Sequence, residues 1–352
     1  MTDSVVRHAG DFLIDVGKRL NLGCDSSVVR RVLERACGGE LPTLGPDGRR
    51  ASGLTRPGIP FEVSVTGGRG RYEPAFRYVT ESGTNSARFS SRLADQRAAI
   101  RELLAGFPGG VEAEGDMFDW FITSLYPESA NIPASRSFGT WTGVAHHAAV
   151  PRSPARLKVY GGLFDGSRAL ERLRHGRPEF DGLSVIPEGE RLIRASLAAV
   201  EIDVDGAVKH KVYLRAKRGD VAVPLKLIRY FGDPAWEALS ELVRCGLDPA
   251  RFYEHDVLIC RARDAGTTTT FALNMLAHRH DDLGDLVREL AVRHHGSTEA
   301  VDALTDAANS CGASLYFSAI CLGFSAEHGI DKLNVYATPT WDVEERTLPQ
   351  IA

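Results

Sequence analysis

The chain has 352 residues, 43% hydrophobic and 25% charged, which is typical of a globular protein with one large domain or two ordinary ones. Its formal net charge of −4 gives no electrostatic reason to expect binding to nucleic acid or to an anionic membrane. The six cysteines form no C-x-x-C pair and no zinc-type spacing with histidine, so we expect neither a zinc site nor a disulfide framework, and a reducing cytoplasm is the expected location.

The two stretches most relevant to membranes are both polar. The first twenty residues carry charges throughout and have no apolar centre, so they predict no signal peptide. Residues 307–326 are the longest uncharged run, but Asn, Ser and Gly interrupt them too often for a membrane span. We therefore expect no association with a membrane.

Helices and pairs of strands alternate along the chain. Apolar spacing predicts helical structure over 4–36, ending at Gly38-Gly39, and a loop rich in Pro, Gly and Arg over 40–59. Period-two alternation then predicts five strand pairs, at 60–66 with 75–81, 135–148 with 155–163, 197–205 with 208–217, 257–263 with 267–275, and 314–324 with 332–338. Further helices are expected at 85–107, 114–126, 165–175, 234–245 and 281–309. Hairpin turns are expected at Asp205-Gly206 and Ala265-Gly266.

Three of these strands combine cations and a tyrosine on one face. Residues 208–217 alternate so that one face is mainly apolar and the other is mainly cationic. The cationic faces carry Lys209, Lys211, Tyr213 and Arg215 on this strand, Arg156, Lys158 and Tyr160 on 156–160, and Lys332, Asn334 and Tyr336 on 332–336. For one strand alone, a solvated sheet face is the simpler interpretation. The repetition on three strands favours one shared wall.

A closed barrel accounts for this pattern better than an open sheet. Ten antiparallel strands can bury their apolar face under helices, which leaves the polar face either in water or in a lumen. Lys, Arg and Tyr recur on the polar face whereas Glu and Gln do not, so the face is chemically specific. We therefore predict an α+β fold, a ten-stranded antiparallel β-barrel with a polar lumen and helices outside it.

The predicted lumen suits a multivalent anion. Converging lysines and arginines repel one another when the lumen is empty, and a diphosphate or a carboxylate-rich ligand would neutralise them. The tyrosine rings beside them can stack around a cation and exclude water. An allylic diphosphate, whose departure leaves a carbocation, needs both features.

At this point the residues resemble a known family, the aromatic prenyltransferases of the dimethylallyltryptophan synthase type. The similar stretches are Pro60-Phe-Glu-Val-Ser64, Phe76-Arg77-Tyr78 with Glu81, Lys158-x-Tyr160, Lys209-x-Lys211-x-Tyr213 and Tyr336. At 352 residues the chain is closer in length to bacterial than to fungal members. The resemblance implies repeated α-β-β-α units, a single prenyltransferase barrel domain over 1–352, and a helical segment, 1–40, packed outside the barrel.

The resemblance also implies roles for individual residues. Glu62 would hold or deprotonate the acceptor, and because Arg77 lies on the paired strand we expect the Glu62 carboxylate to be ionised. The diphosphate would be bound by Arg77, Lys158, Lys209, Lys211 and Lys332. The allyl cation would be shielded by Tyr160, Tyr213, Phe271 and Tyr336.

The implied activity is the transfer of a prenyl group from an allylic diphosphate to an electron-rich aromatic acceptor. The expected prenyl group is dimethylallyl. The acceptor would be an indole or tryptophan-derived small molecule or a peptide, and the reaction a Friedel-Crafts alkylation. It needs no obligatory metal and no other cofactor, since the prenyl diphosphate is a co-substrate. Regiochemistry, chain length and oligomeric state stay open.

Two strands depart from the family pattern. Strand 267–275 lacks the expected tyrosine, and Phe271 stands in its place. Strand 135–148 offers no counterpart of an expected lysine. With these two departures, the acceptor pocket is the part that the resemblance defines least.

Other motifs have simpler explanations than chemistry. Asp281, Asp282 and Asp285 fit D-D-x-x-D, the magnesium-diphosphate motif of helical prenyl synthases, but acidic residues at a helix start also cap it favourably. The histidine pairs 146–147 and 294–295, and His278 with His280, do not chelate a metal by themselves. The four tryptophans are more typical of core or rim than of a ligand platform.

The alternatives to an aromatic prenyltransferase are a non-catalytic barrel that binds a small anionic or aromatic ligand, a helical magnesium-dependent prenyl synthase, and a nucleic-acid-binding barrel. The acidic net charge disfavours the last.

Overall fold

The computed structural model describes residues 2–341 except 46, 47, 49, 108–111, 128–131, 133–138, 185, 265–268 and 278–281. The strands are β1 Phe61–Gly68, β2 Arg71–Thr80, β3 Thr140–His147, β4 Arg156–Gly162, β5 Ile193–Asp203, β6 Val208–Ala216, β7 Asp256–Asp264, β8 Thr269–Leu276, β9 Ala313–Ser325 and β10 Gly329–Trp341. The α-helices are α1 Thr2–Arg19, α2 Ser26–Cys37, α3 Phe89–Leu104, α4 Glu112–Leu125, α5 Ser167–Gly176, α6 Val223–Phe231, α7 Asp233–Arg244, α8 Gly284–His294 and α9 Glu299–Ser310.

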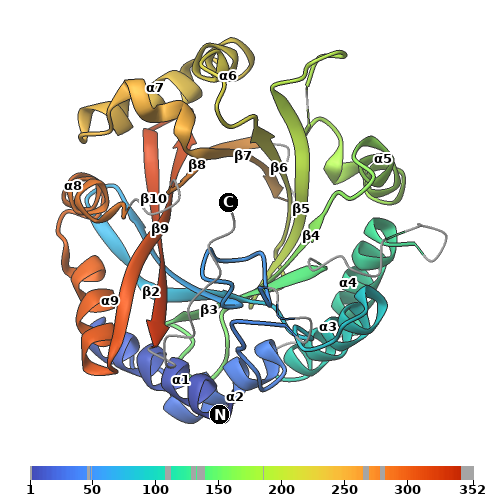
Figure 1. Ribbon diagram of the computed structural model, residues 1–352, viewed down its shortest axis with the longest axis vertical. Helices are drawn as coiled ribbons and strands as arrows, with labels where there is room; N and C mark the ends of the chain where they lie inside the picture. The colour runs from blue at the N-terminus through green and yellow to red at the C-terminus, as the bar shows by residue number, and fades with distance from the viewer. Residues whose placement is uncertain are drawn as a thin grey trace.

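The ten strands close into one antiparallel barrel in the order β1-β10-β9-β8-β7-β6-β5-β4-β3-β2, with the helices arranged around its outside (Figure 1). Each strand pairs with its neighbours in the sequence, and β1 with β10 completes the ring. The predicted fold class is therefore confirmed, and each of the five predicted hairpins is present. Gly206 has a φ of 81°, as the predicted turn at Asp205-Gly206 requires. The predicted turn at Ala265-Gly266 lies outside the described residues.

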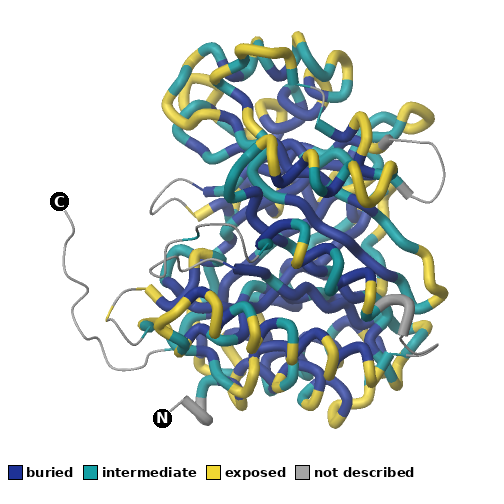
Figure 2. Tube along the Cα trace, turned by 90° about the vertical axis from the view of Figure 1, so that its right-hand side faces the viewer, coloured by how far each residue is buried: buried dark blue, intermediate teal, exposed yellow. Residues whose placement is uncertain are grey.

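Alternate residues of each strand point outward. These outward residues are mainly apolar, so the outer face of the barrel is apolar. Val159, Val212, Leu214 and Val335 are all fully buried on this face. Figure 2 shows the consequence, with buried segments across the middle of the molecule and exposed ones along the outer helices and loops. The other alternate residues point into the barrel, and they build the site described below.

The helices match the predicted segments except in two places. Segment 4–36 is two helices, α1 and α2, separated by Asn21 and Gly23 with φ of 53° and 61°. The side chain of Asp25 then caps α2 by accepting a hydrogen bond from the amide of Ser27 at 2.8 Å. Helix α6 is not among the predicted helices, since it is only nine residues long.

The N-terminal helices lie outside the barrel wall (Figure 1). Phe12 of α1 packs edge-on against Trp341 at the end of β10, with 6.4 Å between the ring centroids. No helix in the described part of the chain has both the length and the apolar character needed to cross a membrane.

Candidate active site

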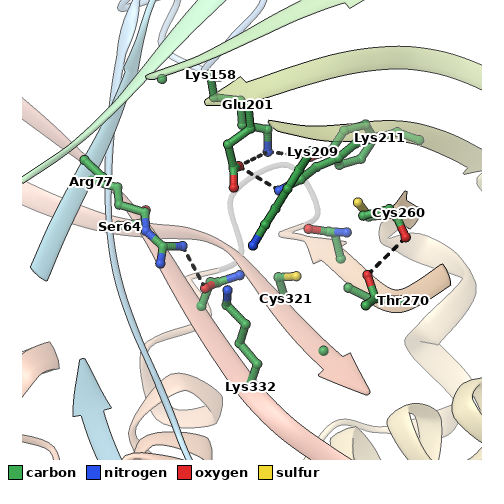
Figure 3. Close-up of a pocket in the computed structure, with 18 of the residues that line it drawn as sticks. Ser64, Arg77, Lys158, Glu201, Lys209, Lys211, Cys260, Thr270, Cys321 and Lys332 are labelled. Atoms are coloured by element: carbon green, nitrogen blue, oxygen red, sulfur yellow. Dashed lines mark hydrogen bonds and ion pairs between the residues drawn. The ribbon is translucent and has the colours of Figure 1, made fainter. Parts of the chain in front are cut away.

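The barrel encloses a cavity of about 270 Å³ whose wall combines cations, tyrosines and small residues. Figure 3 shows Arg77, Lys209 and Lys332 directed toward a common space from three different strands. The cavity is lined by nine of the ten residues that the sequence assigned to a site, namely Arg77, Lys158, Tyr160, Lys209, Lys211, Tyr213, Phe271, Lys332 and Tyr336. The tenth, Glu62, lies beside the cavity rather than in its wall. The structure thus brings these residues together, and their roles stay predictions.

Strand register explains why these residues meet. Ser64 of β1 is paired with Arg77 on one side and with Tyr336 on the other. On the opposite part of the wall, Lys158 of β4 pairs with Glu201 of β5, which in turn pairs with Lys209 of β6. Residues that are paired across adjacent strands point to the same face of a sheet, so the antiparallel register alone places these side chains in the lumen.

Carboxylates are interleaved with the lumen cations, which corrects the expectation that glutamate does not recur there. A carboxylate oxygen of Glu201 lies 2.7 Å from the Lys211 amino group and 3.9 Å from that of Lys158, and the other oxygen lies 3.4 Å from Arg156 Nε. Asp203 bonds Arg156 as well. The empty lumen is therefore partly neutralised by its own acidic residues. The register places Glu201 between Lys158 of β4 and Lys209 of β6, and it places Asp203 opposite Arg156 of β4.

The ionisation of Glu201 follows from these neighbours. Burial raises the pKa of a carboxyl group, but the positive charges of Lys211, Lys158 and Arg156 outweigh burial and hold the pKa of Glu201 well below its usual range. Glu201 is therefore a buried carboxylate that stays charged. In the absence of another anion it is the counter-ion of this part of the cavity.

Tyrosine rings enclose the amino group of Lys158. Its Nζ donates a hydrogen bond to Tyr213 Oη at 2.7 Å and lies 4.2 Å from the centroid of the Tyr160 ring. The rings of Tyr160 and Tyr213 pack 6.0 Å apart. The Tyr160 ring thus lies close enough to the Lys158 amino group for a cation–π contact.

Arg77 and Lys332 form a separate cationic corner. Arg77 bonds Glu73 at 2.8 Å and Asn334 Oδ1 at 3.4 Å, and its buried Nε has no hydrogen-bond partner in the described part of the chain. The charge of Arg77 and burial together lower the pKa of Lys332 to about 8. Among the described residues, no carboxylate lies within salt-bridge distance of the Lys332 amino group. This corner therefore carries excess positive charge, which an incoming anion would neutralise.

Glu62 sits on β1 in a less polar part of the same lumen. It is paired with Val79 of β2 and shares its face with Ser64, so it points into the barrel as predicted. Its carboxylate accepts a hydrogen bond from Ser318 Oγ at 2.6 Å. Ser318 reaches it because the pairing of β9 with β10 shifts by one residue next to Ser318, which turns that side chain inward.

The expectation that Glu62 is ionised through Arg77 is wrong. Arg77 is engaged by Glu73 and Asn334 instead. Burial raises the pKa of Glu62 to about 7, and the hydrogen bond from Ser318 lowers it only in part. At neutral pH the group is thus divided between its acid and its carboxylate form.

A third buried carboxyl group, Glu81, closes this end of the lumen. It bonds Arg92 and Ser52 at 2.7 and 2.5 Å, and Trp141 Nε1 donates to it at 3.1 Å. Burial raises its pKa to about 7 even though Arg92 is adjacent. Trp141 packs against Tyr160 with 6.3 Å between ring centroids, so this tryptophan belongs to the lumen and not to the outer core.

Similarity to known proteins is found among solved structures. No protein-family model and no curated protein matches the sequence. Among solved structures, the 5-dimethylallyl tryptophan synthase from Streptomyces coelicolor in complex with DMASPP and Trp superimposes with a TM-score of 0.70 at 16% identity, covering 98% of each chain. The 6-dimethylallyltryptophan synthase from Micromonospora olivasterospora, also in complex with DMASPP and Trp, gives 0.64 at 18% identity over 96% of this chain and 97% of that chain. AnaPT from Neosartorya fischeri gives 0.59 at 13% identity over 89% of this chain and 86% of that chain.

The chain has the prenyltransferase-barrel fold. At identities below 20%, these similarities show the fold and not the chemistry of the lumen.

Two strands lack the side chains that the family pattern predicts at the cavity. On β3, Gly143 and Ala145 line the cavity, and the sequence offers no lysine there.

On β8, Phe271 borders the cavity but belongs to the outer face of the barrel. It pairs with Arg261, which pairs with the outward-facing Val212, and its ring packs against Phe231 of α6 with 5.5 Å between ring centroids. The register therefore turns the Phe271 ring away from the lumen, which contradicts its predicted role as a cation shield. The inward residues of β8 are Thr270, Ala272 and Asn274.

The described residues of the remaining motifs do not line the cavity. Asp282 accepts a hydrogen bond from the amide of Phe317 on β9, and Asp285 lies in the first turn of α8, where its charge faces the helix dipole favourably. Asp281, His278 and His280 lie outside the described residues. His294 bonds Glu241, and His295 bonds the carbonyl of Leu333. Within the described ranges, no group of three or more His, Cys, Asp or Glu side chains is placed to hold a metal ion.

Proposed function

We propose that this chain transfers a dimethylallyl group from its diphosphate to an electron-rich aromatic acceptor, an indole or tryptophan-derived compound. One observation carries the proposal. A single lumen holds a cationic, tyrosine-lined cavity and, beside it, a buried carboxyl group, Glu62, whose pKa burial raises to about 7. Two solved structures with the same fold were described with DMASPP and Trp bound, which supports this pair of substrates.

The cationic cavity would bind and stabilise the diphosphate. When the allylic C–O bond breaks, the bonding electron pair stays on the diphosphate oxygen, and negative charge builds up at the leaving group. Arg77 and Lys332 on one side, with Lys158, Lys209 and Lys211 on the other, are placed to stabilise that charge in a site shielded from water. The faces of Tyr160, Tyr213 and Tyr336 would stabilise the allyl cation and exclude water from it.

Glu62 would act on the acceptor. A π-electron pair of the acceptor ring forms the new C–C bond to the allyl cation, and a proton must then leave the alkylated acceptor. The carboxylate of Glu62 can accept a hydrogen bond from an acceptor N–H or O–H and take up its proton. A pKa of about 7 is well matched to this task, because a general base works best when its pKa is near the working pH.

The cations of the lumen would make a metal unnecessary. Five lysine and arginine side chains surround the proposed diphosphate position and supply the positive charge that magnesium provides in other diphosphate sites. We therefore propose that the reaction needs no obligatory metal and no other cofactor.

The test is a mass-spectrometric screen of prenyl diphosphates against tryptophan, cyclic dipeptides, other indoles, phenols and short peptides, run with and without EDTA. A product heavier than an acceptor by one prenyl group, formed in EDTA, supports the proposal. Binding of a prenyl diphosphate without any prenylated product from this panel would favour the alternative, a non-catalytic barrel that binds a small anionic ligand.

A further inference from the structure

Glu201 is the feature of the cavity that the proposed function leaves unexplained. Its side chain is 7% exposed and lies among three cations, with Lys211 Nζ at 2.7 Å, Arg156 Nε at 3.4 Å and Lys158 Nζ at 3.9 Å. Two of these three, Lys158 and Lys211, belong to the proposed diphosphate site. In Figure 3 the Glu201 carboxylate lies inside the cavity and points toward the lysine amino groups.

A carboxylate at this position opposes anion binding. Like charges repel strongly where water is excluded, and a diphosphate would have to share the amino groups that Glu201 already occupies. The Glu201 carboxylate stabilises the charges of the cavity only when no other anion is bound. Burial lowers the pKa of Lys158 and the charge of Glu201 raises it, so Glu201 helps to keep the lysine protonated before a ligand arrives.

We propose that Glu201 is a resident counter-ion, which an entering diphosphate displaces from Lys211 and Lys158 and which returns to them when the diphosphate leaves. This inference rests on the proposed function and adds a property to it. The exchange weakens the binding of every anion, so only a ligand with several negative charges can compete. It also assists release of the product diphosphate, because the lysines regain a partner as the product departs.

The exchange couples anion binding to proton uptake. In the empty cavity three cations keep Glu201 ionised in spite of its burial. After displacement the burial remains, two of the cations serve the diphosphate, and a second anion lies nearby. All three changes favour the protonated carboxyl group. Binding of a diphosphate should therefore be accompanied by uptake of a proton at this residue.

Calorimetric titration with inorganic pyrophosphate tests the exchange without any requirement for prenyl transfer. The proteins are wild type, Glu201→Gln and, as the matched control, Asp203→Asn, which removes a carboxylate two residues along the same strand. Titrations in two buffers of different ionisation enthalpy give the number of protons taken up. We expect Glu201→Gln to bind pyrophosphate at least about tenfold more tightly, the equivalent of one charge-assisted hydrogen bond. We also expect it to take up fewer protons than wild type, and Asp203→Asn to change both quantities less.

The outcomes separate this inference from the function on which it rests. Pyrophosphate binding by wild type that is not tightened in Glu201→Gln, or that is tightened equally in Asp203→Asn, overturns the counter-ion role and leaves the proposed function intact. Failure of every protein to bind pyrophosphate contradicts both. Glu201→Asp is the second variant if Glu201→Gln does not fold. It keeps the charge but shortens the reach to the lysines, so it should bind pyrophosphate with intermediate affinity, and weaker binding than wild type would overturn the proposal.

Discussion

Glu201 and Glu62 occupy the same lumen, and both are shielded from water, yet their pKa values move in opposite directions. Three cations surround Glu201 and hold its pKa well below the usual range. Glu62 has a serine hydroxyl as its partner, and burial raises its pKa to about 7. Burial disfavours the charged form of both, so the neighbours decide which one stays ionised.

Glu81 extends the comparison, because one cation lies beside its carboxylate whereas three lie beside that of Glu201. Arg92 lies 2.7 Å from its carboxylate, and nevertheless burial raises its pKa to about 7. One adjacent guanidinium does not overcome the cost of removing this carboxylate from water. The lumen thus has a cationic part, built around Glu201, where charge is retained. It also has a part near Glu62, the proposed acceptor part, where a carboxyl group can gain or lose a proton.

The largest effect is expected at the acceptor part. Glu62→Gln keeps the shape of the side chain but removes its charge and its ability to take up a proton. We expect turnover to fall by about ten to ten-thousand-fold, the usual range for a general base, while donor binding is kept or slightly tightened. Steady-state turnover with the best acceptor measures this. Near wild-type turnover would show that Glu62 is only a strand residue.

A smaller effect, mainly on donor binding, is expected at the cationic part. Lys211→Ala removes one charge-assisted contact and should weaken donor binding by about 1.5–3 kcal/mol, with a loss of turnover as well. Titration with dimethylallyl diphosphate measures the change. The matched control is Lys217→Ala, which removes an exposed lysine just beyond the end of the same strand, and its affinity should be unchanged. Unchanged donor affinity in folded Lys211→Ala would exclude this residue from the site.

The pH dependence should show both parts of the lumen at once. Glu62 must lose its proton to act as a base, so activity should rise as the pH passes through about 7. Lys332, whose pKa the charge of Arg77 and burial lower to about 8, loses its own charge above that value, so donor binding should weaken there.

Two variants show which group causes each limb of the pH profile. Glu62→Gln should lose the rising limb, and Lys332→Arg should move the falling limb to higher pH, because arginine stays protonated. A rising limb that persists in Glu62→Gln would mean that another group supplies it.

The smallest effect is expected from removal of metal ions. If the lysines and arginines supply the charge that stabilises the diphosphate, transfer should proceed at the same rate in excess EDTA. Activity that disappears in EDTA and returns with magnesium would instead direct attention to an acidic site. Product formation, followed by chromatography over the same time course in both conditions, decides between them.

The barrel and the cationic wall could be predicted from the sequence because both depend on period-two alternation. Lys158, Lys209 and Lys211 share a face with tyrosines on short strands, and a residue's face follows from its position alone. Strand pairing follows from hairpins, which are local. This is why the ten strands and the cationic wall could be predicted, whereas Arg77 and Phe271 were assigned through the family resemblance.

The charge balance could not be predicted, because it depends on contacts between strands. Glu201 faces the lysines only through the register of β4, β5 and β6. Ser318 reaches Glu62 only through an irregularity in β9, more than 250 residues away in the sequence. The protonation of Glu62 depends on these neighbours and on burial, so an expectation based on the nearest charged residue in the hairpin, Arg77, was wrong.

The central claim is that one part of the lumen binds the donor while the other handles the acceptor's proton. It is tested most directly by measuring the dissociation constant of dimethylallyl diphosphate and the single-turnover rate on the same preparations of wild type, Glu62→Gln and Lys211→Ala. We predict that Lys211→Ala loses donor affinity, whereas Glu62→Gln keeps it and loses the rate at saturating donor. Loss of donor affinity in Glu62→Gln, with a normal rate at saturation, would contradict the division of the lumen into these two parts.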